Sequence, residues 1–218
     1  YDEALSYYER ALLIRRRLGD EKTIATSIFG MAEIHLKQGA LSRAEASFRE
    51  ALQVRRQLAD GAGEIAALTG LGTVYHAKGD HKTANQTWNE ALSVAHEIGD
   101  GQAKASLLCR MGETLLDQGK TDEATVCLSQ ADQLASDSGA PRLALDVFTV
   151  QARGALARGE YDRAFTLIEQ ALELGELQGA EALHGRALRV RARTLHGSVE
   201  NLPGDNSETL SEATRCYE

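Results

Sequence analysis

Apolar and polar residues follow one another with the period of an α-helix, most clearly in residues 68–91. Leu71 and Tyr75 lie four residues apart in the first half of this stretch, and Ala84 and Trp88 lie four apart in the second half. Since residues three and four apart share one face of a helix, each half predicts a helix with one apolar stripe. The two stripes can meet, so the stretch predicts a pair of packed helices joined by a turn.

The same pattern returns every 40 residues along the chain. Four glycines keep this step at the turn inside each predicted helix pair: Gly39, Gly79, Gly119 and Gly159. A column of alanines and a column of large apolar residues keep the same register: Ala44, Ala84, Ala124 and Ala164, and Tyr8, Phe48, Trp88, Leu128 and Ile168. Several columns in one register are typical of repeat proteins, in which each unit buries its apolar face against its neighbours.

These motifs resemble the tetratricopeptide repeat (TPR), whose pattern is L-G-x-x-Y followed by G-x-Y-x-x-A-x-x-x-F-x-x-A. The helix pair in residues 68–91 matches this pattern with Leu71, Gly72, Tyr75, Gly79, Ala84, Trp88 and Ala91. The repeat is longer than the usual length of about 34 residues, and the proline after the last alanine is missing. Such longer repeats are similar to those of kinesin light chain, spindle-orientation adaptors and bacterial signalling proteins. The resemblance covers nearly the whole chain and implies an all-α fold, a right-handed α-solenoid superhelix of helix-turn-helix repeats.

The resemblance implies a single TPR array over residues 1–218. Residues 1–20 are expected to supply only the second helix of a partial repeat. Four full repeats are expected next, at residues 21–60, 61–100, 101–140 and 141–180. Residues 181–218 are expected to form a divergent repeat with a loop at 196–208 before its second helix. Because the array starts in mid-repeat and stops inside a helix, we expect it to be a fragment of a longer chain.

Charge and composition narrow the range of partners. The formal net charge of −8 argues against nucleic acid, because phosphate binding needs a concentrated basic surface. The chain has no run of about 18 apolar residues, so a membrane span is not expected. Its three scattered cysteines do not suggest a disulfide framework, and we expect a cytoplasmic protein.

The residues that carry chemistry form no recognisable catalytic motif. Gly70 and Gly72 lack the third glycine and the preceding strand of a dinucleotide-binding fingerprint. None of the six histidines belongs to an H-E-x-x-H motif or to a Cys/His cluster with metal-ligand spacing. Cys109 is more typical of a core or groove thiol than of a nucleophile. We therefore expect no enzyme activity, no cofactor and no metal.

In the TPR family the first helices of the repeats line the concave side of the superhelix, where peptides or partner helices bind. Carried over by register, the groove residues would be Glu33, Thr73, Glu113, Arg153 and Arg193, with Arg186 and Arg189 at neighbouring positions. The acidic members come early in the chain and the arginines come late. The lysine–asparagine clamp of the chaperone-binding TPRs is not reproduced.

The late arginines suggest a basic pocket for an acidic or carboxylate-bearing segment, because the arginine fork pairs well with carboxylates. The alternative is that they pair inside the protein with Asp146, Glu181 or Glu113, or are simply solvated. The resemblance implies a non-catalytic scaffold that binds a peptide or a partner helix in the concave groove. A second interpretation is a regulatory or sensor arm of a larger bacterial signalling protein, such as a kinase or a transcription activator.

Overall fold

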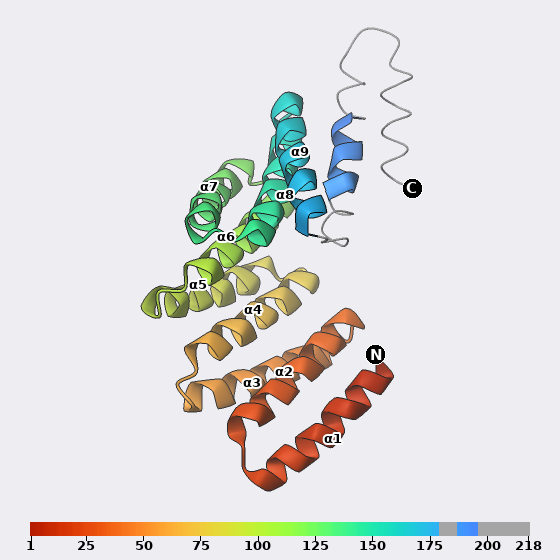
Figure 1. The fold of residues 1–218 in the computed structure, drawn as a ribbon, viewed down its shortest axis with the longest axis vertical. Coiled ribbons are helices and arrows are strands. Elements are labelled where there is room, and N and C mark those ends of the chain that lie inside the picture. The colour runs from red at the N-terminus through yellow and green to blue at the C-terminus, as the bar shows by residue number, and fades with distance from the viewer. Residues whose placement is uncertain (179–186, 196–218) are drawn as a thin grey trace. The chain divides into compact units, whose positions relative to one another are not determined.

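The chain is built from consecutive helices joined by short turns (Figure 1). A computed structural model describes residues 1–178 and 187–195, and this part of the chain contains no strand. The all-α architecture of consecutive packed helix pairs that the sequence predicts is therefore confirmed. The helices gather into two compact units, residues 1–103 and residues 104–218, each with its own packing.

The first unit contains α1 (Asp2–Leu18), α2 (Glu21–Lys37), α3 (Leu41–Gln57), α4 (Gly61–Ala77), α5 (His81–Glu97) and the start of α6 (Gly101–Asp117). Each helix from α1 to α4 packs against the next one in the chain, and α2 also touches α4. Contact between helices two apart in the chain is expected when helix pairs stack, because each pair covers the apolar face of its neighbour.

Aspartates in the turns fix where the helices of the first unit begin. The Asp80 carboxylate accepts a hydrogen bond from the Thr83 backbone N–H at 3.1 Å, and Asp60 accepts one from Gly63 at 3.0 Å. Such side chains satisfy backbone donors that have no partner within the first helical turn. The turn before Asp80 is closed by Gly79, whose φ of 78° lies in the left-handed region that favours glycine.

Small residues let the two helices of a pair approach closely. A Cβ atom on Gly72 would collide with the indole ring of Trp88, so α4 and α5 meet there without a side chain between them. The Trp88 Nε1–H donates a hydrogen bond to the Thr69 carbonyl at 3.2 Å, and Trp88 is 2% exposed. Ala84 and Ala91 are fully buried beside it. The contact between the apolar stripes of this helix pair is thus confirmed.

The second unit contains most of α6, α7 (Thr121–Ser138), α8 (Pro141–Ala157), α9 (Tyr161–Gln178) and a helical segment at residues 187–195. α8 packs against both α7 and α9. One core cluster joins Ile168 of α9 to Leu145 of α8 and to Val190 of the 187–195 helix. Another joins Leu128 of α7 to Val147 of α8. The apolar column at Leu128 and Ile168 is therefore part of the core.

Parts of the predicted last repeat lie outside the described residues. These parts are the loop at 196–208, the helix expected after it and residues 181–186, among them the predicted groove residue Arg186. None of the helices described in residues 1–178 and 187–195 is long and apolar enough to span a bilayer.

Candidate functional site

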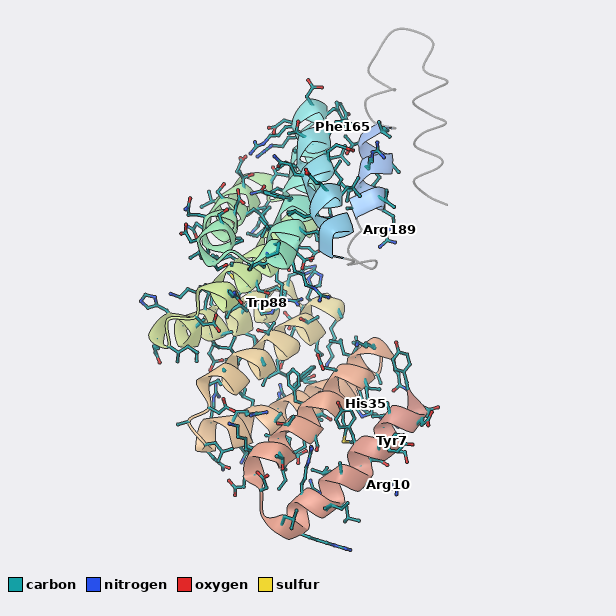
Figure 2. The ribbon with its side chains drawn as sticks, viewed as in Figure 1. Tyr7, Arg10, His35, Trp88, Phe165 and Arg189 are labelled. Carbon is teal, nitrogen blue, oxygen red and sulfur yellow. The ribbon has the colours of Figure 1, made fainter. Side chains whose placement is uncertain are left out.

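Four of the predicted groove residues line one cavity in the second unit. This cavity, which we call the basic cavity, has a volume of about 180 Å³ and is lined by Glu113, Thr149, Arg153, Arg189, Val190 and Arg193. Its walls come from α6, α8 and the 187–195 helix, which supply one, two and three of these residues. Figure 2 labels Arg189 on the 187–195 helix.

The 40-residue period explains why these side chains meet. Glu113, Arg153 and Arg193 occupy the same place in three consecutive repeats, so stacking of the first helices brings them side by side. Two other lining residues, Val190 and Thr149, are buried and anchor the cavity to the core. Val190 is buried in the core, and the buried Thr149 hydroxyl donates to the Leu145 carbonyl at 2.8 Å.

The three arginines of the basic cavity have different partners. The Arg153 guanidinium lies 2.6 Å from the Glu113 carboxylate and 3.0 Å from the Asp117 carboxylate. Arg153 is therefore paired inside the protein, as the alternative interpretation of the late arginines expects. Arg189 and Arg193 are exposed, and neither forms an ion pair within the part of the chain that the structure describes. The cavity has three guanidinium groups against one lining carboxylate, so it carries an excess of positive charge.

A smaller cavity in the second unit also has Glu113 in its lining. It has a volume of about 60 Å³ and is lined by Ser106, Cys109, Arg110, Glu113, Leu143, Asp146 and Val150. Cys109 is buried there and belongs to the core cluster around Val147, as expected of a core or groove thiol. Glu113 is thus shared by a mixed apolar and charged cavity and by the basic cavity.

Two other predicted groove residues, Glu33 and Thr73, lie in the first unit. Glu33 is exposed on α2, and Thr73 of α4 donates its hydroxyl hydrogen to the Thr69 carbonyl at 2.9 Å. Both belong to the first unit and line neither cavity. Asp117 was not expected at the site. Its spacing of four residues from Glu113 places it on the same face of α6, which is the signal that would have found it.

The structure gives no reason to assign a metal to this site. Within residues 1–178 and 187–195, no group of three or more His, Cys, Asp and Glu side chains is placed to hold a metal ion. The polar side chains of the basic cavity are suited to ion pairs and hydrogen bonds with an anionic group.

Solved structures with the same fold are TPR proteins of several kinds. BtubC (BKLC) from P. vanneervenii is 17% identical, with 99% of this chain and 87% of that chain covered at a TM-score of 0.75. The chain also matches a Signal Transduction ATPase with Numerous Domains (STAND) from Pyrococcus horikoshii that has a tetratricopeptide repeat sensor. That match is 14% identical and covers 96% of this chain and 38% of the other, at a TM-score of 0.71.

PilF from Pseudomonas aeruginosa is 18% identical, with 88% of this chain and 90% of that chain covered at a TM-score of 0.59. At these identities the matches establish a shared fold. A comparison with curated protein sequences finds no match. A family model described as the MalT-like TPR region matches residues 3–203, which is most of the chain. The chain therefore belongs to the MalT-like TPR region family.

Proposed function

We propose that the chain is a non-catalytic protein-interaction module that binds an acidic segment of a protein partner at the basic cavity. The observation that carries the proposal is the difference in ion pairing among the three arginines of the basic cavity. Arg153 is held by Glu113 and Asp117, whereas Arg189 and Arg193 are exposed and have no ion-pair partner within the described residues. Two such guanidinium groups, four residues apart on one helix, can grip a carboxylate from two directions.

The size of the cavity supports recognition of a side chain or of a chain terminus. Pockets for drug-sized ligands usually measure about 300–1,000 Å³. At about 180 Å³ the basic cavity is smaller, which fits one carboxylate-bearing group of a larger partner. The rest of the binding energy would come from contacts along the first helices of the repeats, while the charges set the register of the bound segment.

A second candidate function is a sensor arm of a larger signalling protein. It is favoured by the family, named for its MalT-like TPR region, and by the similarity to a STAND ATPase with a TPR sensor. In that case the basic cavity would contact another domain of the same polypeptide or a ligand that releases it. The sequence of the full-length protein separates the two functions, because an effector domain beside the array favours the sensor.

The proposed function is tested on an array of short peptides that differ in their Asp and Glu content. The wild-type chain is compared with the double variant Arg189→Glu/Arg193→Glu. A matched control, Arg17→Glu/Arg43→Glu, makes the same charge change at exposed arginines of the first unit. We expect wild type and control to select peptides with acidic residues, and the test variant to lose this selection while keeping its helicity. If wild type, the test variant and the control all bind the same peptides, the proposal is refuted.

A further inference from the structure

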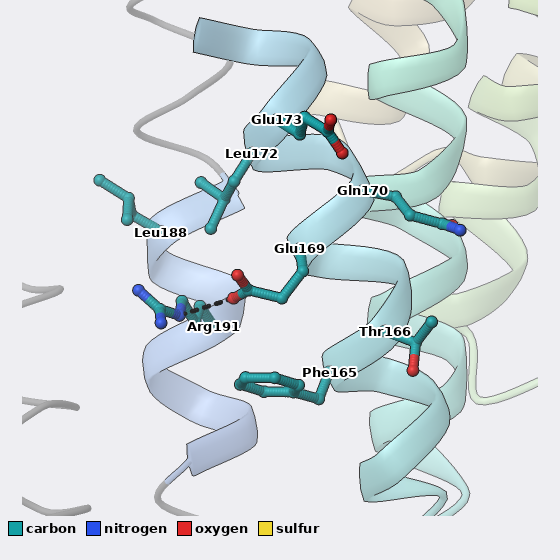
Figure 3. Close-up of a pocket in the computed structure, with 8 residues that line it drawn as sticks. All are labelled: Phe165, Thr166, Glu169, Gln170, Leu172, Glu173, Leu188 and Arg191. Carbon is teal, nitrogen blue, oxygen red and sulfur yellow. Dashed lines mark ion pairs between the residues drawn. The ribbon is translucent and has the colours of Figure 1, made fainter.

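Two arginines of the basic cavity differ from their neighbour on the same helix. Arg191 lies on the opposite side of the 187–195 helix from Arg189 and Arg193, since it is two residues away from each of them. In the pocket between this helix and α9, the Arg191 guanidinium lies 2.9 Å from the Glu169 carboxylate (Figure 3). Arg189 and Arg193 are exposed and form no ion pair within the described residues. The side of the helix that lines the basic cavity therefore presents two cations to solvent.

The adjacent interface, between α6 and α8, shows how an arginine at this place in the repeat is held. The Arg153 guanidinium lies 2.6 Å from the Glu113 carboxylate and 3.0 Å from the Asp117 carboxylate. Glu113 comes 40 residues before Arg153 in the chain, and Asp117 comes 36 residues before it. Two negative charges from the preceding first helix thus hold one guanidinium group.

The residues that correspond to these two carboxylates for Arg193 are not acidic. The residue 40 positions before Arg193 is Arg153, and the residue 36 positions before it is Ala157. Arg153 lines the same cavity, so Arg193 has a second cation where Arg153 has a carboxylate. Arg189 adds a third guanidinium group to the lining. The two negative charges of the adjacent interface therefore have no counterpart at the equivalent described positions of this one.

The arrangement of the arginines favours a doubly charged ligand with more than two oxygens. A carboxylate has two oxygens in one plane, so only one arginine fork at a time can pair with both of them. A phosphate group on a side chain has three strong acceptor oxygens and a charge of about −1.5 to −2 at neutral pH. Because Arg189 and Arg193 share one helix face, each fork can pair with a different edge of such a group. Glu113, the lining carboxylate, is already paired with Arg153.

We propose that the basic cavity binds a phosphorylated serine or threonine side chain of the protein partner, with the phosphate between Arg189 and Arg193. This inference rests on the proposed function and makes it more specific, because it names the group of the acidic segment that enters the cavity. The phosphate supplies the two negative charges that Arg153 receives from Glu113 and Asp117. The cavity volume of about 180 Å³ accommodates a group of this size at the end of a short side chain.

The test uses the peptide array with each acidic position printed in three forms, as glutamate, phosphoserine and serine. The whole wild-type chain is applied at about pH 7.5, where the phosphate is mostly a dianion. We expect the phosphoserine forms to bind most strongly, the glutamate forms less strongly and the serine forms least. If the glutamate forms are selected with no gain for phosphoserine, this proposal is overturned and the proposed function stands. If neither acidic form is selected over serine, both are overturned.

The second negative charge of the phosphate is tested by pH. Fluorescence anisotropy should show that the phosphoserine form of the best peptide binds about three- to tenfold more tightly than its glutamate form at about pH 7.5. The second pKa of a phosphate group is about 6, so this ratio should fall at least by about half at about pH 5.5. Glutamate ordinarily titrates near about 4.3 and stays ionised, so its peptide corrects for titration of the protein. A ratio that does not change with pH would contradict recognition of the dianion.

Lysine variants separate the arginine fork from the charge. Arg189→Lys/Arg193→Lys keeps both positive charges but cannot make the paired hydrogen bonds of a guanidinium group. We expect this variant to bind the glutamate form nearly as well as wild type does and to lose most of the preference for phosphoserine. Arg17→Lys/Arg43→Lys makes the same change at exposed arginines of the first unit and should keep the full preference. An undiminished preference in Arg189→Lys/Arg193→Lys would overturn the assignment of the phosphate to these two side chains.

Competition distinguishes a phosphorylated partner from a small phosphorylated molecule. Inorganic phosphate and free phosphoserine are each added to the complex with the phosphoserine peptide at constant ionic strength. We expect both to displace the peptide only at concentrations far above its own dissociation constant, because they lack the contacts along the first helices. Displacement by free phosphoserine at concentrations similar to those of the peptide would assign the cavity to a small ligand and overturn the proposal of a protein partner.

Discussion

The Arg153 guanidinium lies 2.6 Å from the Glu113 carboxylate, although the two residues are 40 positions apart in the chain. This separation equals one repeat, so the pair joins equivalent places on the first helices of two neighbouring repeats. The same stacking puts Arg193 one repeat further along the cavity wall. Pairing with Glu113 and Asp117 satisfies Arg153 within the protein, and the excess positive charge of the cavity therefore comes from Arg189 and Arg193.

Releasing Arg153 should strengthen binding of an acidic peptide. The variant Glu113→Gln/Asp117→Asn removes both carboxylates that hold it, and its guanidinium then adds to the basic cavity. We expect the affinity for an acidic peptide selected on the array to rise about two- to fivefold, measured by fluorescence anisotropy. The control Glu9→Gln/Glu97→Gln removes two exposed carboxylates from the first unit. Equal gains in both variants would mean that only net charge matters.

The contact between Gly72 and Trp88 predicts a large effect of a small substitution. In Gly72→Ala the added methyl group meets the indole ring, so either the ring or the helices must move. We expect a loss of about 1–3 kcal/mol in the free energy of unfolding, as for other overpacked cores. Urea unfolding followed by the fluorescence of Trp88, the single tryptophan, measures it.

Gly101→Ala is the matched control for this substitution, because a Cβ atom on Gly101 has no neighbour within 4 Å. We expect little change in its stability. A loss as large as that of Gly72→Ala would show that glycine removal itself, and not the contact with Trp88, is responsible.

The helix cap at Asp60 predicts a pH-dependent contribution to stability. The Gly63 backbone N–H and then Arg55 lower the pKa of the Asp60 carboxyl group below its ordinary value of 3.8. A carboxyl group with a lowered folded pKa stabilises the protein above its unfolded pKa, and this stabilisation is lost as the pH falls through the folded value. Asp60→Ala should therefore cost about 1 kcal/mol at neutral pH.

The cost of Asp60→Ala should shrink in acid, at pH values below about 3.8. Urea unfolding at a series of pH values measures this difference. Asp60→Asn retains a capping oxygen and should lose less stability than the alanine variant at neutral pH. If the alanine and asparagine variants were equally unstable, the hydrogen bond to Gly63 would not be the stabilising feature.

The pair Glu45–Lys78 tests whether a basic side chain stabilises the interface between α3 and α4. The two side chains are 16% and 31% exposed, so their ion pair is only partly screened by water. A double-mutant cycle with Glu45→Gln and Lys78→Met should give a coupling energy of about 1 kcal/mol. A coupling energy near zero would mean that Lys78 does not contribute to holding α3 against α4.

Much of the fold and part of the site could be predicted from the sequence. The alanine and large apolar columns identified the helix pairs, and the repeat period placed Glu113, Arg153 and Arg193 together. Periodicity shows which face of a helix a residue occupies, but not which rotamer its side chain adopts. For that reason the sequence left open whether the arginines bind a partner's acidic segment, pair inside the protein or are solvated, and it missed Asp117.

A charge-exchange experiment tests the proposed function most directly. Fluorescence anisotropy is used to compare wild type with Arg189→Glu/Arg193→Glu, using an acidic peptide selected on the array and a copy with lysine at the acidic positions. We expect wild type to bind only the acidic peptide and the variant to bind the lysine peptide in its place. If the variant binds the acidic peptide as well as wild type does, the basic cavity is not where the partner's acidic segment binds.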